Sequence, residues 1–266
     1  MTDKKPLILI SNDDGVRSPG LAAAAAALRP LGDLLIVAPY EQQSGMGRSM
    51  PGINDGRLHE TIISVNGTQT TAYGAVASPA QAVQHGILEL ATRKPALAVS
   101  GINYGENVGT GITVSGTVGA ALEAAAHGIP SIAISQQVEF HQHLTYDEVD
   151  FSGAQHFLRM FAERLLAMDQ MPPDVDVLKL EIPAGATPET PWRVTRLERA
   201  PYFVPLVEQR TDFSVAGPIG YEMGSLDDLD EESDAHALHA GFVAVTALTL
   251  DMTSRIAYDD LRKALE

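Results

Sequence analysis

Two adjacent carboxylates, Asp13 and Asp14, stand between Asn12 and Gly15 at the end of a short apolar run. Neighbouring side chains in a strand face opposite ways, so the two acids converge only if the strand ends there and the backbone turns, which Gly15 permits. Carboxylates held together repel one another unless a cation lies between them. A hard cation with oxygen ligands, Mg²⁺, Mn²⁺ or Ca²⁺, suits such a pair. The alternative interpretation is a helix N-cap or an Asx turn, where Asn and Asp are also common.

A second polar segment, Gln43–Ser49, follows the apolar run that ends at Pro39. Its serine hydroxyls and its glycine amides, with Ser44 and Gly45 at the start, suit a loop that approaches an oxyanion or a metal ion. An ordinary turn has the same composition, so this segment by itself leaves both interpretations open.

A third segment, Ser100–Gly109, is rich in glycine and asparagine, and Ser115-Gly116-Thr117 follows it. Ordering so many glycines costs conformational entropy, which makes a purely structural loop a poor use of them. The Ser115–Thr117 stretch begins a predicted helix, where free amides and the helix dipole favour a bound phosphate. Neither a Walker A loop nor a dinucleotide-binding fingerprint is present. Helix capping by the serine and the threonine is the alternative.

The elements that must position these segments alternate between short apolar strands and helices, which is typical of an α/β protein with a mostly parallel sheet. The strands are predicted at 7–11, 34–38, 97–100 and 131–135, and the helices at 19–28, 79–91 and 117–127, with Ser18 and Ser115 as caps. In open α/β sheets, ligands bind outside the carboxyl ends of the strands. The three polar segments, which each follow a strand, are therefore expected to share one rim of the sheet.

Beyond residue 150 the pattern changes. A helix is predicted at about 151–168, strands at 175–182, 192–197 and 242–250, and a short amphipathic helix from Ser254. Residues 200–240 have little periodicity, and so long a loop is typical of an arm, a lid or an oligomerisation element. We therefore divide the chain into a core with the active site, residues 1–150, and residues 151–266, which complete the core and add this arm, lid or oligomerisation element.

The composition limits the class of function. Thirty-four acids against eighteen bases give the 266 residues a formal charge of −16, which argues against binding to a nucleic-acid backbone. The acidic run Asp227–Asp234 is expected to be a solvated loop. There is no cysteine, so thiolate metal sites are excluded, and the apolar run Leu7–Ile10 is too short for a signal peptide or a membrane span. We therefore expect a cytoplasmic protein without membrane contact.

The other candidates for chemistry are weaker. His141 and His143, and His236 and His239, form close pairs without a third ligand at a suitable spacing, so we expect surface or loop histidines. A Gly-x-Ser-x-Gly nucleophile motif is absent from the sequence.

The order of the polar segments resembles the SurE family, the stationary-phase survival proteins that act as metal-dependent 5'-nucleotidases. The matching segments are Ile8–Gly15, Ser44-Gly45, Ser100–Gly109 and Ser115–Glu123. The resemblance runs in order from about residue 7 to 135 and resumes weakly at 194–197, at Asp234 and at 241–246. Val114, residues 75–80 and residues 205–225 depart from the family pattern, and none of them is an expected metal ligand.

The resemblance implies a Rossmann-like three-layer core and, within residues 151–266, a C-terminal β-rich extension, a β-hairpin arm that exchanges between subunits of a homodimer or homotetramer. It also implies one divalent cation per subunit, Mg²⁺ or Mn²⁺. Its ligands at the matching positions are Asp13, Asp14, Ser44 and Asn103. By hypothesis both aspartates are catalytic, and Asp13 orients or deprotonates the attacking water. The phosphate would be held by Asn12, Gly45, Asn107, Ser115, Gly116 and Thr117.

The function that this resemblance implies is hydrolysis of nucleoside 5'-monophosphates, with 3'-monophosphates and short polyphosphate as further possible substrates. One alternative is a phosphatase for a phosphate ester that is not a nucleotide. Another is a regulator that binds nucleotide or phosphate without turnover, although all four expected ligands are present.

Overall fold

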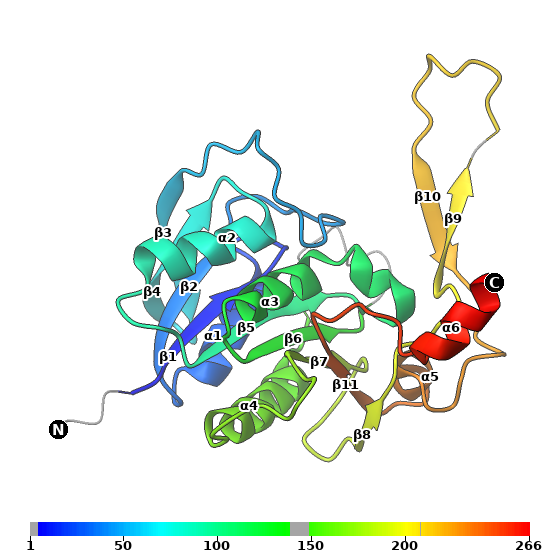
Figure 1. Ribbon diagram of the computed structural model, residues 1–266. Coiled ribbons are helices and arrows are strands. Elements are labelled where there is room, and N and C mark those ends of the chain that lie inside the picture. Colours follow the sequence, from blue (N-terminus) through cyan, green and yellow to red (C-terminus); the bar gives the residue numbers. More distant parts are fainter. Residues whose placement is uncertain (1–4, 139–148, 208) are drawn as a thin grey trace.

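The fold of this chain is described from a computed structural model, in which residues 5–138, 149–207 and 209–266 are placed (Figure 1). Over these residues, nine strands form one sheet in the order β3-β4-β2-β1-β5-β6-β7-β11-β8, and β9 and β10 form a separate pair. The strands are β1 (Leu7–Ser11), β2 (Asp33–Pro39), β3 (Leu58–Val65), β4 (Thr68–Ala75), β5 (Leu97–Tyr104), β6 (Ser131–Gln136), β7 (Val177–Ile182), β8 (Trp192–Thr195), β9 (Phe203–Val207), β10 (Ile219–Met223) and β11 (Val243–Leu248). The helices are α1 (Pro19–Leu28), α2 (Pro79–His85), η1 (Gly86–Leu90), η2 (Gly109–Thr113), α3 (Gly116–Ala126), α4 (Ser152–Leu166), α5 (Asp234–His239) and α6 (Tyr258–Leu265).

The centre of the large sheet is parallel. β1 lies between β2 and β5, and β6 and β7 continue the parallel order on the β5 side. The antiparallel neighbours lie further out, where β3 pairs with β4 and β11 with β7. A mostly parallel sheet with a small separate antiparallel pair is the predicted fold class, which is therefore confirmed.

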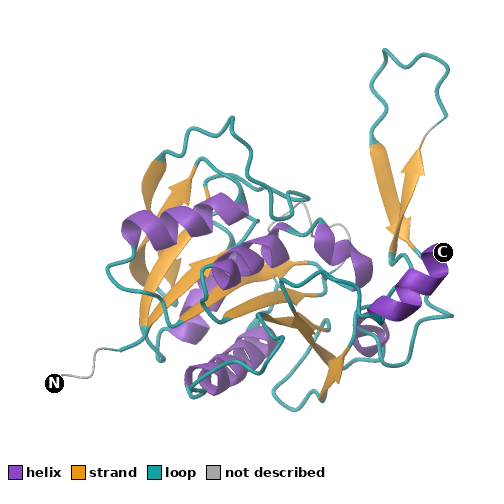
Figure 2. Ribbon diagram, in the orientation of Figure 1, coloured by secondary structure: helices purple, strands orange, loops and turns teal. Residues whose placement is uncertain are grey.

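Helices cover both faces of the sheet and give three layers (Figure 2). Successive side chains of β1 face opposite layers. Ile8 and Ile10 pack in the hydrophobic cluster that contains residues of α1 and α4, whereas Leu9 packs in the cluster that contains residues of α2 and α3. Both faces of the central strands are thus buried, which is why they read as continuous apolar runs. The carboxyl ends of β1, β2 and β5 meet at one rim, and the polar segments follow them.

Two features of the sheet differ from the sequence prediction. The strand predicted to end at Ser100 continues to Tyr104, with a shift in its register to β6 between Ser100 and Asn103. Gly101 allows this, because its φ is +129° and a Cβ at this position would lie 2.1 Å from the carbonyl oxygen of Ile134. The β3–β4 hairpin was not predicted at all, although its Asn66-Gly67 turn, with both φ angles positive, is a typical hairpin signal.

Some helix boundaries also differ. The helix predicted over 79–91 is α-helical only to His85 and continues as the π-helical turn η1. Ser18 lies at the N-cap of α1, but its side chain makes no capping hydrogen bond. Ser115, in contrast, caps α3 with its side chain as predicted.

The C-terminal part carries an arm. β9 and β10 pair in antiparallel fashion and project away from the sheet, and α6 lies near their base (Figure 1). None of the residues of α6 is buried. In the part of the chain that the structure describes, no helix is long and apolar enough to span a membrane.

Candidate functional site

The Asp13-Asp14 pair lies in a turn that begins where β1 ends. The side chain of Asn12 closes this turn, since its Nδ2 donates to the carbonyl of Gly15 and its Oδ1 accepts from the amide of Gly15, both at 3.1 Å. Gly15 has a φ of +98°, a conformation that glycine adopts without strain. Both aspartates are buried, with 6% and 4% of their surfaces exposed. The turn therefore brings two adjacent carboxylates into the interior of the rim.

Asp13 lies at the N-terminus of α3. The hydroxyl of Thr117 donates to Asp13 Oδ1, and a Cβ on Gly116 would lie 2.7 Å from Asp13 Cβ and 2.8 Å from its Oδ2. Burial raises the pKa of Asp13, and hydrogen bonds from the Thr117 side chain and from the amides of Thr117 and Gly116 oppose this rise. The helix start thus supplies donors to the charged form of the carboxylate.

Asp14 is bound from two other segments. The amide of Tyr104 donates to its Oδ2 at 3.2 Å, and Gln42 Nε2 lies 3.5 Å from its Oδ1. Burial, and then the charge of Asp13, raise the pKa of Asp14 to about 8. Both acids therefore stand where ionisation is unfavourable unless positive charge is near.

The Gln43–Ser49 segment packs against both the aspartate turn and α3. The amide of Gln43 donates to the carbonyl of Asp13 at 2.8 Å, and the amide of Gly47 donates to the carbonyl of Val114 at 2.9 Å. A Cβ on Gly119 would lie 2.3 Å from the carbonyl oxygen of Gly47, so only glycine allows this approach. The segment that carries Ser44 is thus fixed beside the aspartate turn.

A buried acid anchors the far end of this segment. Arg48 Nε lies 2.7 Å from Glu123 Oε2 of α3, and Gln84 Nε2 donates to Glu123 Oε1 at 2.9 Å. Ser44 itself is exposed and makes no hydrogen bond with the described residues, and a Cβ on Gly45 would meet nothing within 4 Å. Both are therefore open to an incoming ligand.

Asn103 and Asn107 meet at Ser135. Asn103 is in register with Ser135 on the neighbouring strand β6, and Asn107 Nδ2 donates to the Ser135 hydroxyl at 2.9 Å. Asn103 Nδ2 donates to the carbonyls of Gly105 and Tyr104, at 2.7 and 3.3 Å. Its Oδ1 accepts no hydrogen bond from the residues that the structure describes, and so it can bind a cation.

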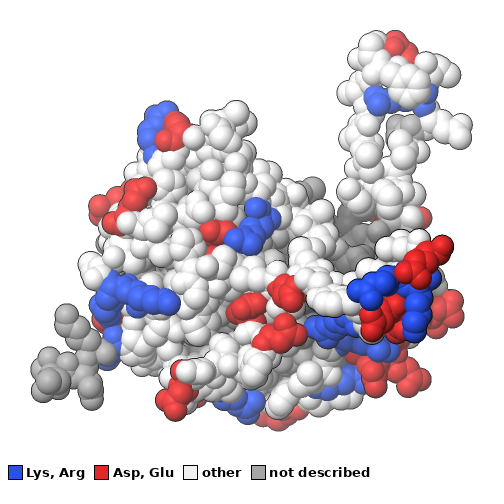
Figure 3. Space-filling view, viewed as in Figure 1, with Lys and Arg blue, Asp and Glu red and all other residues white. Residues whose placement is uncertain are grey.

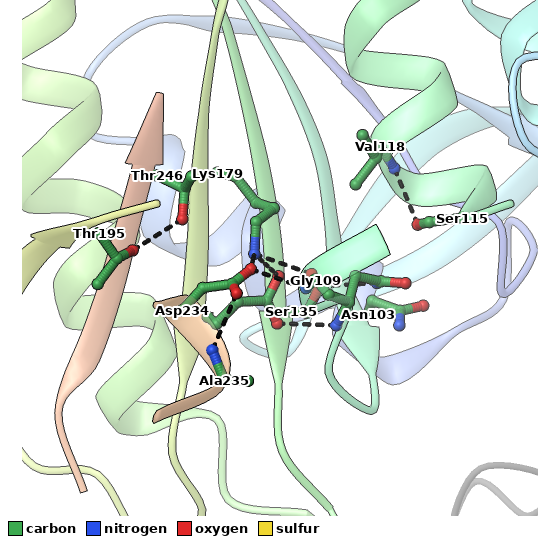
Figure 4. Close-up of polar contacts among 12 residues, drawn as sticks. Asn103, Gly109, Ser115, Val118, Ser135, Lys179, Thr195, Asp234, Ala235 and Thr246 are labelled. Carbon is green, nitrogen blue, oxygen red and sulfur yellow. Dashed lines mark hydrogen bonds and ion pairs between the residues drawn. The ribbon is translucent and has the colours of Figure 1, made fainter. Parts of the chain in front are cut away.

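The ten predicted residues thus fall into four groups. Contacts join Asp13 and Asp14 to α3 and to the end of β5. Asn103 and Asn107 lie together beside Ser135, and Ser44-Gly45 reaches the aspartate turn through the neighbouring Gln43 amide. The side chains of Asn12 and Ser115 bind backbone groups: Asn12 binds Gly15, and Ser115 accepts from the amide of Val118 at 3.1 Å. Figure 4 shows Ser115 at the start of its helix and Asn103 near Ser135.

The donor chemistry of the rim fits a hard divalent cation. Two carboxylates, an amide oxygen and a hydroxyl are oxygen ligands, which Mg²⁺ and Mn²⁺ prefer. A cation would also relieve the repulsion and the burial that raise the two pKa values. Within residues 5–138, 149–207 and 209–266, no three His, Asp or Glu side chains converge to hold a metal ion. A cation at this rim would therefore need neutral ligands beside the aspartates.

Several residues of the rim were missed from the sequence. Gln42 and the Tyr104 amide bind Asp14, and Lys179 and Glu181 lie behind the Asn107 loop. A lysine and a glutamate two positions apart in an otherwise apolar strand share one face, and this pattern was the signal for them.

The acidic run Asp227–Asp234 was predicted to be a solvated loop, and this is wrong for its last two residues, Ser233 and Asp234, which are fully buried. Asp234 is fully buried, as the first residue of α5, and it pairs with Lys179 at 2.9 Å. The prediction failed because the cation that offsets this acid lies 55 positions earlier in the chain. His141 and His143 lie outside the described residues, and His236 Nδ1 lies 2.8 Å from Arg193.

A cavity of about 560 Å³ lies between α1, β3 and the start of α4. Arg17, Ser18, Asp150 and Phe151 are among its lining residues, and it includes none of the ten predicted site residues. This cavity is therefore separate from the candidate site at the rim.

The sequence and the fold are similar to those of known proteins. The model of the family described as survival protein SurE matches residues 8–203. The 5'-nucleotidase SurE of Thermococcus gammatolerans is 42% identical over 97% of this chain and 95% of its own length, and that of Methanocella arvoryzae is 42% identical over 93% of each. The crystal structure of the SurE protein from Aquifex aeolicus superposes with a TM-score of 0.77 at 29% identity, covering 98% of this chain and all of that one. The chain belongs to the SurE family.

Proposed function

We propose that this protein is a 5'-nucleotidase, a divalent-metal-dependent enzyme that hydrolyses nucleoside 5'-monophosphates to nucleoside and phosphate. The curated relatives carry the name 5'-nucleotidase, at about 40% identity over nearly the full chain. The observation that carries the proposal is the buried Asp13 carboxylate, which lies against the N-terminus of α3 with Asp14 beside it. Helix amides next to a pair of acids suit a metal-bound phosphate ester.

One Mg²⁺ or Mn²⁺ per subunit would be held by Asp13, Asp14, Ser44 and Asn103. When bound, such a cation polarises a phosphoryl oxygen and lowers the pKa of a coordinated water. The two carboxylates supply the negative charge that holds the cation. The neutral oxygens of Ser44 and Asn103 complete the ligand set without adding further negative charge.

The phosphate would lie on the start of α3 and on the loops beside it. Gly116 and Thr117 would contribute through the dipole of the helix, which attracts an anion, because their amides already donate to the Asp13 carboxylate. The Gly45 amide and the Asn107 side chain approach from the flanking loops. Asn12 and Ser115 would contribute by shaping the aspartate turn and the helix start, because their side chains are already bonded to backbone groups.

Asp13 is the acid that would orient the attacking water and accept its proton. Thr117 donates to Oδ1 and so fixes the orientation of the carboxylate. Asp14, bound by the Tyr104 amide, would serve as the second anionic ligand.

The wider setting of the enzyme is also part of the proposal. A formal charge of −16 favours small phosphorylated substrates, 3'-monophosphates and short polyphosphate among them, over a nucleic-acid backbone. We place the protein in the cytoplasm. We assign residues 1–150 to the core with the active site, and residues 151–266 to the rest of the core and to an arm that joins subunits into a homodimer or homotetramer.

Phosphate release from a panel of substrates tests this function. The panel contains 5'- and 3'-nucleoside monophosphates, short polyphosphate and phosphate esters of sugars and alcohols, each with Mg²⁺, with Mn²⁺ and with a chelator. We expect the highest kcat/KM for a 5'-monophosphate, and loss of turnover with the chelator. A higher kcat/KM for an ester without a base would identify a different phosphatase. Saturable nucleotide binding without release under any cation would identify a binding protein.

A further inference from the structure

A cluster of three buried charges lies behind the rim, outside the set of residues that the proposed reaction uses. Lys179 Nζ is 2.9 Å from Asp234 Oδ2 and 3.2 Å from Glu181 Oε1, and all three side chains have 0% of their surface exposed. Burying such a cluster costs more free energy than filling the same volume with apolar side chains. Stabilisation of the core therefore does not explain the cluster, and its contacts indicate another role.

Each member of the cluster binds the backbone of the Asn107–Gly109 loop. Lys179 Nζ donates to the carbonyl of Asn107 at 2.8 Å. The amide of Asn107 donates to Glu181 Oε2 at 2.9 Å, and the amide of Gly109 donates to Asp234 Oδ2 at 3.0 Å. Figure 4 shows Lys179 reaching from its strand toward Asp234 and the loop at Gly109.

The loop needs such partners because it lies outside the strand ladder. Gly105, which lies between β5 and the loop, and Gly109, at the end of the loop, have φ angles of +94° and +57°, so the chain leaves β5 in a conformation that continues no sheet. Buried amides and carbonyls must still be paired. The ion cluster supplies the pairing, and charge-assisted hydrogen bonds are stronger than neutral ones.

The loop delivers the Asn107 side chain to Ser135, in register with Asn103. The cluster therefore holds the backbone on both sides of a residue that the proposed function assigns to the phosphate. Asp234 and Tyr202, whose hydroxyl donates to Glu106 at 3.1 Å, come from the segments that flank the arm. The loop is thus fixed from β7 and from the C-terminal part together.

We propose that Lys179, Glu181 and Asp234 are positioning residues, a buried ionic clamp that holds the Asn107 loop in place for the substrate phosphate. This rests on the proposed function, because it assumes that Asn107 binds the phosphate. The clamp itself touches neither substrate nor cation.

A double-mutant cycle with Asn107 tests the clamp. We expect Asn107→Ala and Lys179→Met each to lower kcat/KM about 10- to 100-fold, because small displacements of binding groups have effects of this size. Since the clamp acts through Asn107, the kcat/KM of the double variant should be no more than about twofold below that of the less active single variant. Multiplied losses in the double variant would overturn the proposal.

Thr246→Val is the matched control. Thr246 is buried and in register with Lys179, and its hydroxyl bonds to that of Thr195 at 2.9 Å, while among the described residues no side-chain hydrogen bond joins it to the loop. We expect this variant to lower Tm while kcat/KM stays within about twofold of wild type. A loss of kcat/KM that follows Tm in both Thr246→Val and Lys179→Met would mean that the cluster acts only through stability.

Amide hydrogen exchange gives a readout that does not depend on activity. In the substrate-free protein, Lys179→Met should speed exchange of the Asn107 and Gly109 amides at least tenfold, with the amides of β1 unchanged. Unchanged exchange at both loop amides would overturn the clamp. If Lys179→Met does not fold, Asp234→Asn replaces it. Faster exchange of the Gly109 amide is then expected, and unchanged exchange of this amide would contradict the clamp. If exchange is faster in Lys179→Met but Asn107→Ala keeps full activity, the clamp stands and the proposed role of Asn107 in phosphate binding is rejected.

Discussion

Asp13 and Gly116 lie so close together that a methyl group on Gly116 would be 2.7 Å from Asp13 Cβ. Gly116 lies in the first turn of α3 and its φ is not positive, so this close approach, not backbone conformation, requires glycine there. The contact places the free amides of α3 against a carboxylate of the rim. It ties the Asp-Asp turn and the Ser-Gly-Thr segment, about a hundred residues apart in the sequence, into one site.

Gly116→Ala should therefore displace Asp13 while leaving the fold intact. We expect kcat/KM for a nucleoside 5'-monophosphate to fall about 100-fold, because an added Cβ forces a shift between the acid and the helix start. Gly111→Ala is the matched control, since a Cβ there would meet nothing within 4 Å. Steady-state kinetics and thermal unfolding of both variants check this, and equal kcat/KM values in the two would contradict it.

The pH dependence of stability reports on Glu181. Burial raises the pKa of this carboxyl from 4.5 to about 7, and the charge of Lys179 opposes part of the rise. The folded chain therefore holds the proton more tightly than the unfolded chain. The contribution is fully present below pH 4.5 and is lost as the pH rises through about 7. The loss amounts to at most ~3 kcal/mol.

Glu181→Gln removes this titration. The Tm of wild type should fall relative to that of the variant as the pH is raised from 4.5 to 7.5. Glu163→Gln, which replaces an exposed acid in the same way, is the matched control. Calorimetry across the pH range tests this, and a constant difference between wild type and Glu181→Gln would show that Glu181 does not titrate differently in the folded chain.

The arm should mediate self-association. Val207 and Ile219 are directly opposite each other on β9 and β10, and they are 67% and 58% exposed. Few charged residues lie along the arm in Figure 3, although its tip carries some. Exposed apolar surface of this kind is typical of a protein–protein contact. Since β9 and β10 extend away from the body, we expect the partner to be a second subunit.

Light scattering after size-exclusion chromatography measures this association. Wild type should elute as an oligomer, and the double variant Val207→Glu/Ile219→Glu as a monomer. Leu88→Glu changes an equally exposed apolar residue on the body of the protein and should remain oligomeric. A monomeric wild type, or a double variant that keeps its oligomeric state, would exclude the arm as the interface.

Much of the candidate site could be proposed from the sequence, because its residues are local in sequence. Asn12–Gly15, Ser100–Gly109 and Ser115–Thr117 each combine a strand end or a helix start with polar or small residues, and such patterns require no knowledge of distant contacts. The rule that parallel strands end at one rim then predicted their convergence. The central strands were recognisable for the same reason, since both of their faces are apolar.

What the sequence did not reveal depends on distant partners. Asp234 reads as one acid among many until Lys179 is placed beside it, and the strand appeared to end at Ser100 because Gly101 is a common terminator. The β3–β4 hairpin was missed although its Asn66-Gly67 turn is a local signal, so that omission was a failure of interpretation. Contacts across the sheet were beyond the reach of any local pattern.

The most direct test of the account is the anomalous difference density of a crystal of this protein soaked in Mn²⁺. One peak per subunit is predicted, within about 2.6 Å of a carboxylate oxygen of both Asp13 and Asp14, with Ser44 Oγ and Asn103 Oδ1 completing the ligands. A peak elsewhere in the subunit, or no peak at the two aspartates at saturating Mn²⁺, would contradict a cation-dependent phosphoester hydrolase at this rim.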